Sequence, residues 1–306
     1  MRINLLSCKS LEFIRLIILF RLYFLHLEQE GCGKMYKKTA LTALIFLILI
    51  TAFTPSFAAA KKKMTDEEFV EFCKTCSAKD IQQVIKSKLA NVNARNKNEL
   101  TPLIAASTFN KDTAVITALI KAKADVNAST SSGLTPLFGA AAMNSLSVVN
   151  VLLKAKANVN FTLPDGDTLL MGVIYSRAMD EDGVKEDPRI IEALIKAKAN
   201  INAKNSKGKT ALMTAAQWSN NVEVLKVLLK AKADKNASDN SGYTVIMHSV
   251  MNFHNNFDML RTLISAGADM NAENKYGSTA LDFAIGGLHY EARLILEEAG
   301  AKSNKF

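Results

Sequence analysis

A seven-residue block, Lys-Ala-Lys-Ala-Asp-Val-Asn at residues 121–127, recurs along the chain and constrains its fold more than any other feature. Close or degenerate copies of this block begin at Lys86, Lys154, Lys196, Lys230, Ser265 and Glu298. The asparagine that ends the block falls at residues 127, 160, 202, 236, 271 and 304, so successive copies are 33, 42, 34, 35 and 33 residues apart. A period in this range is typical of stacked repeats and not of one globular core.

The composition of the 306-residue chain is that of folded protein, with 49% apolar and 22% charged residues. A stack of repeats grows by burying each unit against its neighbours, so the length of this chain counts repeats and not separate domains. The formal charge of +9 falls to about +5 once residues 1–60 are set aside. This mild excess is not the strongly basic footprint of a dedicated nucleic-acid binder, and we expect no specific nucleic-acid partner.

Residues 35–60 have the three parts of a secretory signal peptide. Lys37 and Lys38 follow Met35, an uncharged and mainly apolar run covers residues 40–53, and small residues end the segment. Cleavage is expected after Ala58 or Ala60. An uncleaved anchor is the alternative, but fourteen residues fall short of the roughly 20 that span a bilayer. We therefore expect a periplasmic or secreted protein that meets the membrane only through this segment before cleavage.

Residues 1–34 do not fit ahead of a signal peptide, which should itself be N-terminal. Their apolar stretch is interrupted by Arg15 and Arg21. We expect translation to begin at Met35, because residues 29–31, Gln-Glu-Gly, can be encoded by a purine-rich sequence of the kind that bacterial ribosomes bind. The hypothesis makes residues 1–34 an upstream extension and the source bacterial.

Each block is preceded by patterns for two short helices. Thr65 and Glu68 form a capping-box pattern, and a second helix around residues 80–88 carries Ile81 and Val84 on one face. Later units open with a threonine and an apolar run, at Thr101, Thr135, Thr168, Thr210, Thr244 and Thr279. The sequence therefore predicts two antiparallel helices and an extended turn in each unit.

The Thr-Pro-Leu starts at 101–103 and 135–137, the paired alanines after them, the apolar helix at 148–153 and the block itself resemble the ankyrin repeat over residues 64–306. The resemblance implies an all-α ankyrin-repeat solenoid of helix-turn-helix units with β-hairpin loops, following a cleaved signal peptide. It also implies that each block-ending asparagine ties its hairpin to the next. Within an exported domain of residues 61–306, we expect an N-terminal cap at 64–95, full repeats at 96–129, 130–162, 163–204, 205–238 and 239–273, and a C-terminal cap at 274–306.

Two departures from the family pattern stand out. The pattern has glycine just after the second helix, where the backbone turns left-handed, but this chain has Lys123, Lys156, Lys198 and Lys232 there. These lysines are expected to form a ridge along one edge. The second departure is the 42-residue interval, which places about nine surplus, acidic residues within 177–188. This insertion is either a solvated loop or a partner contact, and it lacks the spacing of an EF-hand calcium loop.

Cys73 and Cys76 form a Cys-x-x-Cys pair in the exported part of the chain. Redox-active pairs place the first cysteine at a helix N-terminus, whereas this pair comes at the end of a predicted helix. We expect structural thiols or a local disulfide. Redox activity is the less favoured alternative.

Other apparent motifs do not indicate catalysis. Gly208-Lys209-Thr210 resembles the end of a P-loop, but Ala203 occupies the position where the first glycine is required. His248 and His254 have no framework of cysteines or carboxylates near them in sequence, which argues against a metal site. We expect neither an enzyme nor a bound cofactor.

Binding is expected on the concave face, where the family places variable residues of the first helix and the hairpin tips. The helix positions assigned to this face are Ser107, Thr108, Ala142, Met143, Tyr175, Ser176, Gln217, Trp218, Met251 and Asn252. The hairpin positions are Leu134, Asp165, Lys207, Lys209, Tyr243, Lys275 and Tyr276. We expect Met143, Tyr175, Trp218 and Met251 to line one groove. Trp218 is either an anchor for a partner or ordinary packing against the neighbouring helix.

These patterns predict a non-enzymatic module that binds another protein. One alternative is a secreted effector or enzyme inhibitor, which would leave the cell. Another is a redox accessory protein that uses Cys73 and Cys76.

Overall fold

The computed structural model describes residues 63–179, 186–252 and 254–305. The expected upstream extension at 1–34 and signal peptide at 35–60 lie outside the described residues, as does the middle of the insertion, 180–185. The described part is helical, and none of its helices is long and apolar enough to cross a bilayer.

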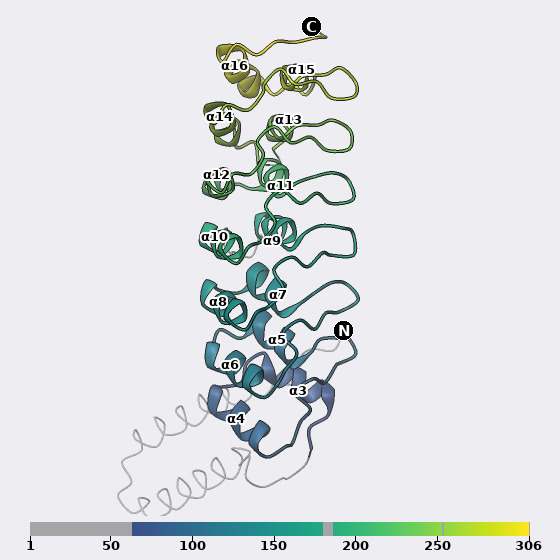
Figure 1. Cartoon of the computed structure of the whole chain (residues 1–306), viewed down its shortest axis with the longest axis vertical. Coiled ribbons are helices and arrows are strands. Elements are labelled where there is room, and N and C mark those ends of the chain that lie inside the picture. The colour runs from purple at the N-terminus through teal and green to yellow at the C-terminus, as the bar shows by residue number, and fades with distance from the viewer. Residues whose placement is uncertain (1–62, 180–185, 253, 306) are drawn as a thin grey trace, which may run out of the picture. The chain divides into compact units, whose positions relative to one another are not determined.

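The helices alternate between two rows along the repeat stack (Figure 1). The inner row contains α3 (Asp66–Cys73), α5 (Pro102–Phe109), α7 (Pro136–Met143), α9 (Leu169–Ala178), α11 (Ala211–Trp218), α13 (Val245–Val250) and α15 (Ala280–Gly286). The outer row contains α4 (Ala78–Lys86), α6 (Thr113–Lys121), α8 (Leu146–Lys154), α10 (Pro188–Lys196), α12 (Val222–Lys230), α14 (Asp258–Ser265) and α16 (Tyr290–Glu298). Each inner helix packs on the next inner helix, and hairpin loops project on the side away from the outer row. This is the helical solenoid that the sequence predicts.

The threonines cap the inner helices as predicted. Thr101 Oγ1 accepts a hydrogen bond from the N–H of Ile104, and Pro102 occupies the first turn, where an N–H has no helical partner. The Thr65 and Glu68 capping box also forms. Thr244 is an exception, because its hydroxyl is buried without a partner.

The hairpin loops are tight turns and not extended strand pairs. In one of them the N–H of Thr130 donates to the carbonyl of Leu134, and Gly133 closes the turn with a φ of +85°. Among the described residues the only strand-like pairings are isolated bridges between Thr162 and Thr168 and between Ser238 and Thr244. The loops are therefore short projections held at their bases.

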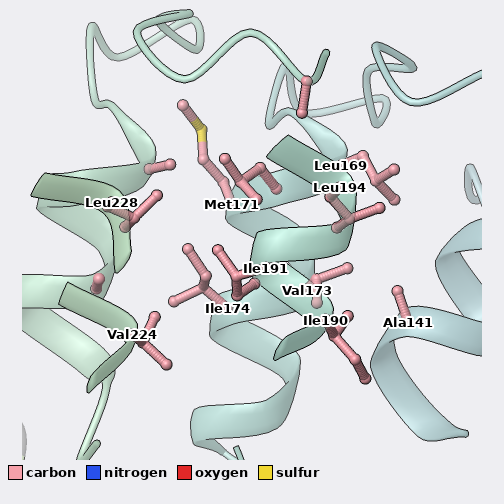
Figure 2. Close-up of a cluster of buried hydrophobic side chains, with 14 of the residues drawn as sticks. Ala141, Leu169, Met171, Val173, Ile174, Ile190, Ile191, Leu194, Val224 and Leu228 are labelled. Carbon is pink, nitrogen blue, oxygen red and sulfur yellow. The ribbon is translucent and has the colours of Figure 1, made fainter. Parts of the chain in front are cut away.

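The core runs continuously from repeat to repeat. Figure 2 shows one portion, in which Ile174 of α9 and Ile191 of α10 lie near Val224 and Leu228 of α12, in the following repeat. Small residues let the inner helices approach closely. A Cβ added to Gly139 would lie 2.1 Å from Thr108 Oγ1 on the preceding inner helix. No repeat therefore encloses a core of its own.

The block-ending asparagines join each repeat to the next, as the resemblance implies. Asn160 Oδ1 accepts from the N–H of Asn200 at 2.8 Å, and its amide donates to the carbonyl of Lys198 at 3.2 Å. The same acceptor bond, at 2.8 to 2.9 Å, is made by Asn93, Asn127, Asn202, Asn236 and Asn271. These bonds satisfy backbone N–H groups in the turn after each outer helix.

The lysines after the outer helices adopt the left-handed conformation. Their φ angles are +70° for Lys123, +63° for Lys156, +70° for Lys198 and +64° for Lys232. Each closes a Schellman cap, as in α6, where the N–H of Lys123 donates to Ile120 and that of Ala124 to Leu119. A left-handed conformation costs a residue with a side chain about 1 kcal/mol relative to glycine. Gly267 and Gly300 occupy this position after α14 and α16.

Replacing Lys232 by glycine should therefore stabilise the stack by about 0.5 to 1 kcal/mol, because the glycine removes the strain of the left-handed lysine. Urea unfolding followed by circular dichroism would show a higher midpoint for Lys232→Gly. The reciprocal control is Gly300→Lys, at a position with φ of +82° and open space around the added Cβ. This control should lower the midpoint, and equal midpoints for all three proteins would contradict the assignment of strain.

Candidate functional site

Large apolar side chains are exposed at the C-terminal ends of successive inner helices. Phe109 on α5 is 52% exposed, Met143 on α7 is 48% exposed and Tyr175 on α9 is 43% exposed. Trp218 and Met251 are half-buried in the next two repeats. The predicted residues Met143, Tyr175 and Trp218 thus lie on consecutive inner helices, and Met251 directly follows α13. Phe109, the most exposed of these side chains, was not among the predicted residues.

Tyr175 and Trp218 belong to adjacent repeats and contact each other. Their ring centroids are 5.3 Å apart and the ring planes meet at 87°, which is an edge-to-face arrangement. Such pairs contribute about 0.5 to 1.5 kcal/mol beyond the area they bury. Trp218 therefore packs against Tyr175 on the neighbouring inner helix, which is one of the two roles expected for it. It also extends the row of exposed side chains beyond Tyr175.

The first-helix assignments contain a one-residue error in two repeats. Ser107 and Thr108 are buried, and Phe109 occupies the exposed position equivalent to Met143. The cause is that α5 carries two alanines where α7 carries three, so counting from the alanines stops too early. Counting eight residues from Thr101 and from Thr135 identifies Phe109 and Met143.

Ala142 and Asn252 are also buried, contrary to the expected exposure. The amide of Asn252 donates to the carbonyls of Ala216 at 2.9 Å and Ser219 at 3.1 Å. This side chain joins the inner helices of adjacent repeats and is not available to a partner. The α13 helix is shorter than its equivalents, which moves the joining residue one position earlier.

The predicted hairpin residues divide into two groups. Exposed side chains belong to Asp165, Lys207, Lys275 and Tyr276, whereas Leu134, Lys209 and Tyr243 are half-buried. Lys209 Nζ donates to Gln217 Oε1 at 2.9 Å, and burial lowers the pKa of this lysine. The ring of Tyr243 lies 5.1 Å from that of Phe283 on α15. The half-buried residues thus fix the hairpins to the inner helices, and the exposed ones form the free tips.

The ends of the insertion are fixed to the stack. Arg177 is 6% exposed, and its guanidinium donates to the carbonyls of Ala141 at 2.5 Å and Asn144 at 2.8 Å. It takes the place that Asn110 and Asn144 hold in the preceding repeats. At the other end, Glu186 accepts hydrogen bonds from Ser219 Oγ and from the N–H of Asn220. Sequence reasoning missed both of these anchors.

His248 makes a buried contact that the sequence spacing does not reveal. Its Nε2 lies 3.2 Å from Asp239 Oδ2, with the two side chains only 4% and 9% exposed. Burial, reinforced by the nearby charge of Lys209, lowers the pKa of His248 to about 4. A carboxylate therefore does accompany this histidine, but no group of three metal-binding side chains occurs among the described residues.

Cys73 and Cys76 are buried free thiols around the C-terminal end of α3. A hydrogen bond between the two sulfurs raises the pKa of Cys73 and lowers that of Cys76. Their carbonyls accept from the amide of Asn110 at 3.1 and 2.9 Å. The pair thus contributes to the first junction of the stack. A disulfide between Cys73 and Cys76 stays a prediction.

A family model described as ankyrin repeats in three copies matches residues 54–163 and 178–274. No curated protein matches the chain. The unmatched gap, 164–177, includes most of α9 and ends at the buried Arg177.

Acid should destabilise the fold through His248. Its folded pKa of about 4 lies below the ordinary 6.5, so protons bind the unfolded chain more tightly and the stability conferred by neutral His248 is lost as the pH falls. The free energy of unfolding should drop by about 2 kcal/mol between pH 7.5 and pH 5 from this residue alone. Urea midpoints across this range would measure the loss. His248→Gln should show a smaller pH dependence, and identical pH profiles for both proteins would contradict the assignment.

Proposed function

Because the chain belongs to the ankyrin repeat family, we propose that it is an exported, non-enzymatic module that binds a partner protein through its inner helices and hairpin tips. Ankyrin repeats generally bind other proteins and are generally not enzymes. The observation that carries the proposal is a row of four side chains: Phe109, Met143, Tyr175 and Trp218. We call it the aromatic row after its three aromatic members. These four side chains lie on four successive inner helices.

The aromatic row has the chemistry of an interface centre. Exposed apolar side chains of this size are scattered singly on most proteins, but here they recur near the C-terminal ends of consecutive inner helices, with Tyr175 one position earlier in its repeat than the others. Tyrosine and tryptophan are enriched among interface residues whose truncation weakens binding most. The edge-to-face contact holds Tyr175 and Trp218 in place before a partner arrives, which reduces the ordering cost of association.

The hairpin tips supply a polar rim of both charges. Asp165 lies on one tip, while Lys207 and Lys275 lie on later ones, with Tyr276 67% exposed beside Lys275. Rim charges mainly govern association rate and partner choice, whereas buried anchors govern affinity. The partner we propose therefore presents an apolar surface flanked by acidic and basic groups.

Export is the part of the proposal that rests on residues 35–60. The basic start, the apolar run and the small-residue end of this segment support secretion to the periplasm or beyond. A secreted effector or enzyme inhibitor would use the same aromatic row. Recovery of the protein from the medium would favour that version, and retention within the cell envelope would favour a resident module.

Replacing Tyr175 by alanine should weaken partner binding by about 10- to 30-fold, because an interface anchor contributes about 2 kcal/mol. A photoreactive residue at Met143 in intact cells would capture and identify the partner. The same crosslink should fall sharply in Tyr175→Ala and further in Tyr175→Ala/Trp218→Ala. Purified proteins would then give the affinities, with circular dichroism confirming that the helices are retained.

Tyr290→Ala is the matched control, since Tyr290 is 72% exposed on α16, outside the aromatic row. This variant should bind the partner as the parent does. Equal crosslinking from Met143 in the parent and in both Tyr175 variants would contradict the placement of the interface.

The double variant Cys73→Ala/Cys76→Ala should retain partner binding. Both thiols are buried at the first junction, and neither side chain belongs to the aromatic row, although Lys74 between them lies over the ring of Phe109. Because their role in the proposal is structural, the expected effect is a lower unfolding midpoint with an unchanged dissociation constant. Loss of function in a protein that remains folded would instead support the redox accessory alternative.

A further inference from the structure

The outer helices end in pairs of exposed lysines that recur in five consecutive repeats. We call these ten residues the lysine ridge: Lys86, Lys88, Lys121, Lys123, Lys154, Lys156, Lys196, Lys198, Lys230 and Lys232. The outer helices α4, α6, α8, α10 and α12 pack one on the next, so equivalent positions follow one another along one edge. Every repeat therefore adds two positive charges to the same edge.

The lysine ridge is retained in spite of backbone strain. The second lysine of each pair has a positive φ, from +54° at Lys88 to +70° at Lys123 and Lys198. Glycine relieves this strain, and the chain uses it at the same position in Gly267 and Gly300. The five earlier repeats thus keep a charged side chain where the fold alone favours glycine.

No side-chain contact within the described residues offsets that strain. No side chain of the lysine ridge takes part in an ion pair or donates a hydrogen bond among those residues. By contrast, Lys209 donates a hydrogen bond to Gln217, and Lys226 forms a hydrogen-bonded ion pair with Glu223. Attraction to the helix C-terminus is a partial compensation, and it acts on any lysine in the last turn. The ten ammonium groups are therefore left to face solvent or a partner.

The chemistry of the ridge narrows the kind of partner. It contains no arginine, so it lacks the planar fork that grips single phosphates in two places. It contains no aromatic side chain on which a nucleobase could stack. Alanines separate the lysines in four of the pairs, as at Ala122, which leaves no large apolar group to insert into a bilayer. What remains is a line of hydrated point charges, suited to an extended anionic surface.

We propose that the lysine ridge binds the surface of a membrane that contains anionic phospholipids, in contrast to the expectation that the chain meets a membrane only through residues 35–60. Basic residues near such a surface are attracted by its negative potential, and the attraction increases with each lysine. The ridge lies on the outer helices, while the aromatic row lies on the inner helices, so the stack carries the two sites on different elements. The membrane site does not depend on the proposed protein partner.

Lysine acetylation footprinting of the full chain tests this surface directly. The protein is mixed with vesicles of phosphatidylcholine alone or with about one third phosphatidylglycerol, and reactivity is read at each lysine by mass spectrometry. The anionic vesicles should slow acetylation of the lysine ridge several-fold, and about 0.5 M NaCl should restore it. Lys79, Lys97, Lys111 and Lys305 are exposed lysines outside the ridge and should keep their reactivity. Uniform protection, or none, would overturn the proposal.

A pair of matched variants separates the ridge from net charge and from folding. Lys123, Lys156, Lys198 and Lys232 are replaced together by glycine, which removes four charges and relieves strain. The control replaces Lys79, Lys97, Lys111 and Lys305 by glutamine, which removes the same number of charges. The extra binding to anionic over neutral vesicles should fall roughly tenfold or more in the ridge variant and stay within about twofold in the control.

Equal losses in the two variants would show that overall charge is responsible and would overturn the proposal. A single-stranded oligonucleotide that protects the ridge as well as the vesicles do, at equal phosphate concentration, would also overturn it. The ridge variant should remain at least as stable as the parent, so loss of folding does not imitate loss of binding.

Discussion

Burial between neighbouring repeats is the interaction on which the rest of the structure depends. Side chains such as Ile174 and Leu228 come from different repeats and share one apolar cluster (Figure 2). A single helix pair cannot cover its own apolar surface, so each repeat is stable only with a neighbour on its exposed side. The asparagines add direction to this contact, because each binds backbone groups of the following repeat and thereby sets the register of the stack.

The insertion shows how strictly this contact is kept. Additional residues between α9 and α10 separate the two helices in sequence, and the polar junction of the other repeats would be lost there. Arg177 binds the preceding repeat through the carbonyl of Asn144, and Glu186 binds the following repeat through the N–H of Asn220. The buried arginine thus reproduces the bonds that asparagine makes to the preceding repeat elsewhere, and the carboxylate of Glu186 accepts two bonds from the following repeat.

The repeat period could be predicted because copies of one block recur in the sequence, and the threonine caps and the position of the lysines after the outer helices could be predicted because each depends on residues close together in the chain. The long-range contacts were less accessible. Phe109 was missed because the alanines that set the count differ in number between α5 and α7. The pairing of His248 with Asp239 requires knowing how a hairpin folds back on the helix that follows it. The sequence placed Tyr175 and Trp218 in one row, but their edge-to-face contact depends on side-chain orientations that the repeat pattern does not specify.

The buried pair of His248 and Asp239 makes one part of the stack more sensitive to acid than the rest. The buried histidine and its carboxylate belong to α13 and its hairpin, near the C-terminal end, whereas the aromatic row begins at α5. Because each repeat is coupled only to its neighbours, a local loss of stability at α13 acts first on α11 and α15, which pack against it. In mild acid the repeats around α13 are therefore expected to loosen before those of α5 and α7.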